Sequence, residues 1–178
     1  DSLTTAAYDP HLAAFDVLLP LLLADYDALP ASDPRKDAFA AQISVLRAWD
    51  RGAGVGSIPT SLAIFWATDV VDQALSDLEG VKDYRARGIT RDAYIAEVAD
   101  RISLDALSRA SDKLAADFGT WQTPWGEINR FQRITGDIVH PHDDNAGSIP
   151  VGFASAFWGS LASFGVRDTQ TKRLYGSY

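Results

Sequence analysis

The histidines of this sequence are its most direct candidates for metal chemistry. His140 and His142 lie close together, and Asp143 and Asp144 follow them directly. Two imidazoles and a carboxylate form a ligand set that transition metals accept. However, this stretch is also rich in turn formers, and His-x-His in a loop is not a specific zinc-ligand spacing. We therefore interpret it as a polar surface loop and predict no metal site.

Motifs for nucleophilic or phosphate chemistry give no catalytic set. The chain has no Cys, which excludes thiol nucleophiles, disulfides and cysteine zinc sites. It has no Gly-x-Ser-x-Gly stretch to present a serine on a sharp turn. The stretch Gly52-x-Gly54-x-Gly56 lacks the Lys of a phosphate-binding loop and follows a helical pattern, so we interpret it as a flexible connection. Asp143 and Asp144 are adjacent and usually would point apart, so we assign no catalytic residue.

Two tryptophans are the candidates for substrate binding. Trp121 and Trp125 flank Gln-Thr-Pro in a predicted loop. Such rings stack well on a sugar or an apolar ligand. They also commonly close the edge of a hydrophobic core, and the sequence leaves both interpretations open.

The composition excludes several classes of partner. The net charge of −8 is the opposite of the basic surface that nucleic-acid binding requires. No basic run is present to hold an anionic membrane, and the longest apolar run, residues 17–24, is far shorter than the roughly 20 residues that span a bilayer. No feature indicates a cofactor. Because the chain begins with Asp1 and contains no Met, we expect it to have been cut from a longer polypeptide.

Apolar residues recur at helical spacing through the first two-thirds of the chain. Asp9-Pro10 and Asp33-Pro34 are each typical of an N-cap followed by Pro in the first helical turn. Residues 80–88 form a poorly patterned connector, and Gly119 suits a helix C-terminus. We therefore predict a mainly α fold of five or six helices, over residues 9–29, 33–51, 59–78, 90–100 and 103–118.

The character of the chain changes at Thr120. Residues 120–178 are rich in Gly, Pro, Ser and aromatic side chains, and short strands are predicted over 128–134, 160–167 and 173–178. We expect one domain over 1–178, with a helical body at 9–119 followed by this loop and short-strand region. Short strands need partners, which the chain itself does not obviously supply.

Several stretches carry a family resemblance. They are residues 26–30 (YDALP) leading into 43–50 (ISVLRAWD), 57–66 (SIPTSLAIFW), 121–130 (WQTPWGEINR), and 148–153 (SIPVGF) with 158–160 (WGS). Their order and spacing resemble the β-subunit of penicillin-amidase-type acylases, which act on penicillins, glutaryl-cephalosporins or acyl-homoserine lactones. The Pro-Trp-Gly-Glu-x-Asn-Arg stretch is the most specific of them.

The resemblance implies an N-terminal-nucleophile hydrolase. In such enzymes a Ser at the start of the β-subunit attacks the amide carbonyl, with its own α-amino group as base and an Asn in the oxyanion hole. Here position 1 is Asp, and Ser2 is followed by Leu3 rather than by the Asn that the family places there. The oxyanion-hole Asn and its nearby Arg belong upstream of the region resembled, so we do not assign those roles to Asn129 and Arg130.

The resemblance therefore implies an internal fragment of the β-subunit that is inactive alone. It would serve as a scaffold against its partners, the α-subunit and the β-subunit sheet core, in the periplasm or outside the cell. The alternative is a free-standing helical module that binds an apolar ligand.

We also expect the end of the chain to associate with a neighbouring copy. Its apolar side chains were selected, on this interpretation, to meet a sheet that residues 1–178 do not supply. We expect them to lose their cover and the open strand edges to pair between copies. The side chains concerned are Phe153, Phe157, Trp158, Leu161 and Phe164.

Overall fold

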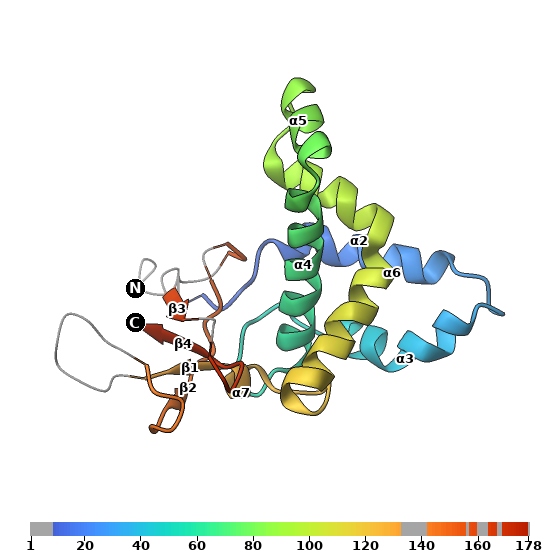
Figure 1. Ribbon diagram of the computed structural model, residues 1–178. Helices are drawn as coiled ribbons and strands as arrows, with labels where there is room; N and C mark the ends of the chain where they lie inside the picture. Colours follow the sequence, from blue (N-terminus) through green and yellow to red (C-terminus); the bar gives the residue numbers. More distant parts are fainter. Residues whose placement is uncertain (1–8, 133–141, 156, 160–163, 167–168, 178) are drawn as a thin grey trace.

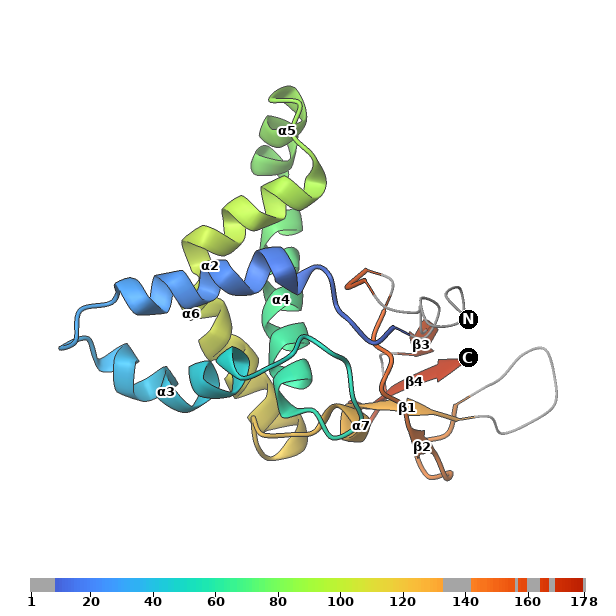
Figure 2. The same ribbon diagram turned by 180° about the vertical axis from the view of Figure 1, so that it is seen from behind.

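A computed structural model describes residues 9–132, 142–155, 157–159, 164–166 and 169–177. Helix α4 (Ile58–Ser76) runs through the centre and packs along α6 (Arg91–Phe118). Helices α2 (Phe15–Ala28) and α3 (Pro34–Arg47) lie on one side of α4, and the strands lie on the other (Figure 1). Seen from behind, α5 (Leu78–Ala86) extends beyond the end of α4 (Figure 2). The prediction of a mainly α fold with a few short strands near its end is confirmed.

The first helix begins later than its sequence signals predict. Helix α2 starts at Phe15 rather than at Pro10. The preceding segment is bonded to a loop instead: the Ala53 N–H donates to the Pro10 carbonyl at 2.8 Å, and the Leu12 N–H donates to the Arg51 carbonyl at 2.8 Å. Leu12 and Phe15 are fully buried, so leaving these backbone groups unpaired would be costly, and the loop satisfies them in place of a helix.

The exposed carboxylate of Asp16 also connects the start of the chain to the loop after α3. It lies 2.9 Å from Nε2 of His11 and accepts a hydrogen bond of 3.0 Å from Arg51. The contact with His11 is the largest cause that lowers the pKa of Asp16, and Arg51 acts in the same direction. The start of the chain and the loop after α3 are thus joined by backbone and side-chain contacts together.

Helix α3 begins at its predicted cap. The Asp33 carboxylate accepts a hydrogen bond of 2.9 Å from the Arg35 N–H, with Pro34 in the first turn. The Arg35 side chain and backbone hydrogen bonds stabilise the ionised carboxylate and lower the pKa of Asp33 to about 2. Helix α4 begins in the same manner, since the Ser57 hydroxyl accepts from the Thr60 N–H at 3.2 Å.

The prediction of a connector at residues 80–88 is wrong, because helix α5 occupies most of it. Its start is fixed by Asp77, whose carboxylate accepts a hydrogen bond of 3.0 Å from the Gly80 N–H. The ring of Tyr84 stacks on that of Tyr94 in α6 at 4.8 Å between centroids. Because the apolar stripe of α5 is narrow, this cap and this tertiary contact determine the helix more than periodicity does.

The prediction of two helices between residues 90 and 118 is also wrong. A single helix, α6, runs for 28 residues. Ser103, which the sequence offered as an N-cap, lies buried on this helix; its hydroxyl donates to Asp25 of α2 and its carbonyl accepts the indole N–H of Trp66 at 3.0 Å. A serine hydroxyl engaged by a neighbouring helix does not compete for the backbone, so the helix continues. The predicted end is confirmed, with Gly119 in the left-handed conformation at φ +87°.

The short strands pair with one another in a four-stranded sheet. They are β1 (Asn129–Phe131), β2 (Ile149–Pro150), β3 (Phe164–Val166) and β4 (Leu174–Ser177), in the order β2-β1-β4-β3. β1 is antiparallel to β2 and parallel to β4, and β3 is antiparallel to β4. The strands thus find partners within the chain, which the sequence did not indicate. Pairing between copies stays a prediction.

The last third of the chain also packs against the helical body. Trp158 was expected to lose its cover, and that is wrong: it is 7% exposed, its ring lies 5.5 Å from that of Phe15, and its carbonyl accepts the Ala14 N–H at 3.3 Å. Phe157 does remain 41% exposed. Leu161 lies outside the described residues, and so does the side chain of Phe164.

Within the described part of the chain, every helix is too short or too polar to cross a bilayer.

The closest approach between the loop after α3 and the last third of the chain occurs at Gly126. Its N–H donates to the Val55 carbonyl at 2.8 Å. A Cβ atom added there would lie 2.5 Å from Cγ1 of Val55 and 2.9 Å from both the Val55 carbonyl oxygen and Cβ of Pro150. Only glycine fits between these atoms without displacing backbone.

We expect Gly126→Ala to lower the free energy of unfolding by about 1–3 kcal/mol, because overpacking a closed site forces the surrounding backbone to shift. Urea denaturation of residues 1–178 measures it. Gly56→Ala is the matched control, since no atom lies within 4 Å of the added Cβ. The control should stay within about 0.5 kcal/mol of the parent chain, and equal stabilities for both variants would contradict the argument.

Candidate functional site

Residues 124–130 form a strap between the loop that precedes α4 and the segment at residues 148–153. Helix α7 (Trp125–Ile128) opens with the Trp125 N–H donating to the Ser57 carbonyl at 3.0 Å. The Trp125 indole N–H donates to the Phe153 carbonyl at 3.4 Å. The amide nitrogen of Asn129 donates to the carbonyls of Val151 at 3.0 Å and Phe153 at 2.5 Å. The strap thus fixes the path of the chain after β2.

Arg130 completes the strap from β1. Its Nε donates to the Ser148 hydroxyl at 2.6 Å, and Nη2 donates to the Ser148 carbonyl at 2.8 Å. Nη1 donates to the Gly126 carbonyl at 2.9 Å. The side chain is only 14% exposed, so its planar donor fork is used for internal positioning.

The Gly52-x-Gly54-x-Gly56 loop takes part in the same junction. The Gly52 carbonyl accepts hydrogen bonds from the Trp49 indole at 3.0 Å and from the Thr60 hydroxyl at 3.1 Å. Gly52 also forms an antiparallel bridge with His11. The sequence predicted a flexible connection, whereas the structure shows a loop bonded to three other parts of the chain.

The strap closes one end of a cavity of about 460 Å³. Pockets of roughly 300–1,000 Å³ are the usual size for small-molecule sites. Its walls come from α4, α6, the strap, the segment around Ser155 and the turn before β4. The lining residues are Ile64, Phe65, Thr68, Asp69, Val71, Asp72, Arg109, Ala110, Lys113, Asp117, Trp125, Asn129, Ala154, Ser155, Phe157, Trp158, Lys172 and Leu174.

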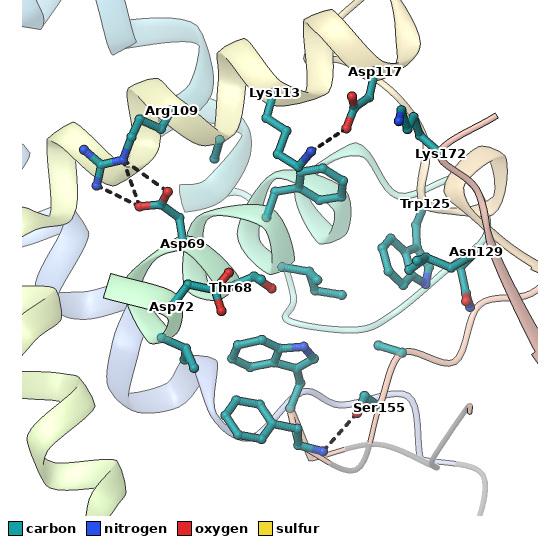
Figure 3. A pocket seen from close by; sticks show the side chains of 18 residues that line it. Thr68, Asp69, Asp72, Arg109, Lys113, Asp117, Trp125, Asn129, Ser155 and Lys172 are labelled. Atoms are coloured by element: carbon teal, nitrogen blue, oxygen red, sulfur yellow. Dashed lines mark hydrogen bonds and ion pairs between the residues drawn. The ribbon is translucent and has the colours of Figure 1, made fainter. Parts of the chain in front are cut away.

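Ion pairs occupy the α6 wall of this cavity. Arg109 donates to Asp69 of α4 through Nε at 3.1 Å and through Nη2 at 2.7 Å, and Lys113 lies 2.7 Å from Asp117 (Figure 3). The hydrogen bonds that Arg109 donates to Asp69 raise the pKa of Arg109. The two donors of the Arg109 guanidinium hold it in one orientation against Asp69, so this group already has an ion-pair partner within the protein.

Aromatic rings form the facing wall. The ring of Phe157 meets that of Trp158 edge-on at 4.6 Å, and the guanidinium of Arg91 lies 5.0 Å from the Phe157 ring. Phe65 of α4 contacts Phe118 edge-on at 6.3 Å. The cavity therefore joins an apolar wall to a charged one, as sites for amphiphilic small molecules do.

Comparison with known protein families matches residues 1–159 to the family described as penicillin amidase. The chain belongs to the penicillin amidase family. This match confirms the resemblance seen in the sequence, and it implies amidohydrolase activity for the parent protein. No curated protein matches the chain.

Within this penicillin amidase chain, the residues that carry the resemblance are engaged in structure. The Asn129 amide donates to two carbonyls, and the Arg130 guanidinium donates to three acceptors. Donors fixed on internal carbonyls are not directed at a reacting oxyanion. These contacts agree with leaving both residues out of the oxyanion hole.

The structure separates the two tryptophan candidates. Trp125 lines the cavity but is 2% exposed, with its indole N–H bonded internally. Trp121 is half-buried, packs against the core and is not among the residues that line the cavity. Of the two, only Trp125 lines the cavity.

The histidine cluster is described only from His142 onward, since His140 lies outside the described residues. The His142 ring stacks on that of Tyr175 at 5.8 Å. The Asp143 carboxylate accepts from the Asn145 N–H at 2.9 Å, as in a turn. Among the residues that the structure describes, no group of three or more potential ligands comes together.

Sequence reasoning missed most of the cavity. Asp69 and Arg109 lie 40 positions apart, and Lys172 follows another 63 positions later (172 − 109). Spacing along the chain carries no signal for such a group. The packing of α4 on α6 brings Asp69 and Arg109 together, and the turn before β4 adds Lys172.

Asp144 anchors the turn that brings Lys172 to the cavity. Its carboxylate accepts hydrogen bonds of 2.7 Å from the Gln170 N–H and 2.7 Å from the Thr171 hydroxyl. The Thr171 hydrogen bond is the largest cause that holds the pKa of Asp144 below its ordinary value of 3.8. Ionised Asp144 therefore stabilises the folded chain above that pH, and this contribution is lost as the pH falls through the lower, folded-state pKa.

We expect Asp144→Asn to be less stable than the parent chain at neutral pH, and the difference to shrink as the pH is lowered below 3.8. Thermal melting across that range measures it. Asp143→Asn is the neighbouring control, because among the described residues its carboxylate bonds only to Asn145 in its own turn. A difference for Asp144→Asn that is constant with pH would refute the assignment.

Proposed function

We propose that residues 1–178 are the helical scaffold portion of a penicillin-amidase-type acylase that hydrolyses linear amides. The substrates would be of the penicillin, cephalosporin or acyl-homoserine lactone class. The observation that carries the proposal is the family match over residues 1–159. A scaffold role is supported by the internal hydrogen bonds of Trp125, Asn129 and Arg130, which fix the path of the chain.

In this proposal the parent enzyme's nucleophile is an N-terminal Ser outside residues 1–178. Its own α-amino group removes the proton while the hydroxyl attacks the amide carbonyl, and an acyl-enzyme forms as the amine leaves. Water then releases the carboxylic acid. The rest of the same acylase, its α-subunit and the sheet core of its β-subunit, would be the partner of this portion, in the periplasm or outside the cell.

The free-standing binding module remains the second candidate. The cavity favours it, because aromatic rings of Phe65, Phe157 and Trp158 meet there in a space large enough for a small molecule. The reading frame around the coding sequence distinguishes the two. The acylase requires an upstream Gly-Ser-Asn site and a strand-rich extension, whereas a stop codon soon after Tyr178 favours the module.

We expect the purified polypeptide of residues 1–178 not to hydrolyse phenylacetyl, glutaryl or acyl-homoserine lactone substrates. Removing a nucleophile of this kind lowers kcat by roughly a millionfold. Amine release, followed with each substrate class, measures it. The control is the longer reading frame processed to an N-terminal Ser, which should turn over at least one of them. Turnover by residues 1–178 alone would overturn the scaffold assignment.

A further inference from the structure

Among the described residues that line the cavity between α4 and α6, one cation has no ion-pair partner. Arg109 and Lys113 are held by Asp69 and Asp117. Lys172 lines the same cavity, and within the described part of the chain its ammonium group has no ion-pair partner. A ligand anion can therefore bind at Lys172 without breaking an existing pair.

The backbone holds Lys172 in an uncommon conformation. Its φ is +63°, in the left-handed region that long side chains rarely adopt. The turn is anchored on both sides of it. The Thr169 hydroxyl donates to the Arg173 carbonyl at 2.7 Å, the Lys172 N–H donates to the Thr169 carbonyl at 3.2 Å, and Arg173 lies 3.5 Å from the Glu127 carboxylate. Backbone strain that the surroundings maintain is typical of positions with a function.

The charges give the cavity a direction. Figure 3 shows Lys172 at the end of the cavity where Trp125 and Asn129 lie, next to the ion pair of Lys113 with Asp117, and Asp72 at the opposite end. Asp72 has no cationic partner in the part of the chain that the structure describes, so it disfavours an anion at its own end. The rings of Phe157 and Trp158 and the side chain of Phe65 line the space in addition. An elongated ligand with a carboxylate at one end and an apolar body matches this arrangement.

We propose that this cavity is a binding site for a carboxylic acid with an aryl or alkyl tail. The carboxylate pairs with the ammonium of Lys172, and the tail lies against Phe65, Phe157 and Trp158. The proposal rests on the proposed function in one respect: hydrolysis of an amide with a hydrophobic acyl group releases an acid of this chemistry.

The test compares two probes of the same shape, phenylacetate and the neutral phenylacetamide. Titration of residues 1–178 with each, followed by tryptophan fluorescence and calorimetry, gives the two dissociation constants. Phenylacetate should bind more tightly than phenylacetamide, and added salt should reduce the difference, because the ion pair at the rim is screened. Equal affinities for the two probes, or no saturable binding of phenylacetate, would overturn the proposal.

Amino-acid substitutions test whether Lys172 supplies the positive charge that binds the carboxylate. Lys172→Gln should weaken phenylacetate binding about two- to fivefold, the range for a solvent-exposed ion pair, and leave phenylacetamide binding unchanged. Lys113→Gln is the matched control, since this lysine lines the same cavity but is bonded to Asp117. Phe157→Ala should weaken both probes. An equal loss for Lys113→Gln and Lys172→Gln would contradict the assignment to Lys172.

Lys172→Gly separates binding from folding. Glycine adopts φ +63° without strain, so this variant should melt at the same temperature as the parent chain or higher, while losing the preference for phenylacetate. Amide turnover by the longer reading frame is measured independently. Turnover there without phenylacetate binding here removes the cavity proposal alone, and binding here without turnover there removes the acylase assignment alone.

Discussion

The arrangement of this chain depends on one close approach of backbone to backbone, where Gly126 meets Val55. The hydrogen bond of 2.8 Å between them places the start of α7 against the loop that leads into α4. With α7 fixed there, Asn129 and Arg130 reach the carbonyls of residues 148–153 and hold that segment across the helices. Trp125 and Asn129 of the strap line the cavity together with side chains of α4 and α6. A side chain at position 126 would move the strap and every contact that follows from it.

The loop at residues 50–56 connects that junction to two other parts of the chain. Its carbonyls and N–H groups bond to the start of the chain, to Thr60 of α4 and to Gly126. Three segments that are distant in sequence thus approach the backbone of the same loop. A polar backbone at such a crossing needs partners, and each segment supplies them for another. The steric demand for glycine lies at Gly126 and not in the loop itself, since an added Cβ at Gly56 would have no atom within 4 Å.

Local signals predicted the helices where a cap and an apolar stripe agree, as at Asp33 and at Gly119. The local signals gave the wrong prediction where tertiary contacts determine whether a helix forms or continues. Ser103 has the type of an N-cap, but Asp25 takes its hydroxyl, and so α6 continues. Helix α5 has too few apolar residues for a clear pattern, and its stacking on α6 is not visible in the sequence. The cavity was missed for the same reason, since its walls come from five segments that are far apart in the sequence.

Asn129 and Arg130 of the family motif have a limited number of hydrogen-bond donors, and this limits what else these side chains can bind. The Asn129 amide has two N–H groups, and both are directed at carbonyls of the chain. The guanidinium of Arg130 donates hydrogen bonds to Ser148 and Gly126. An N–H that is fixed on one acceptor cannot also stabilise the charge that develops on a substrate oxygen without giving up the first bond. Asn129 and Arg130 of the family motif therefore use these donors to stabilise the fold. On the cavity wall, Lys172 has no ion-pair partner among the described residues, which is why the proposed contact with a carboxylate is assigned to it.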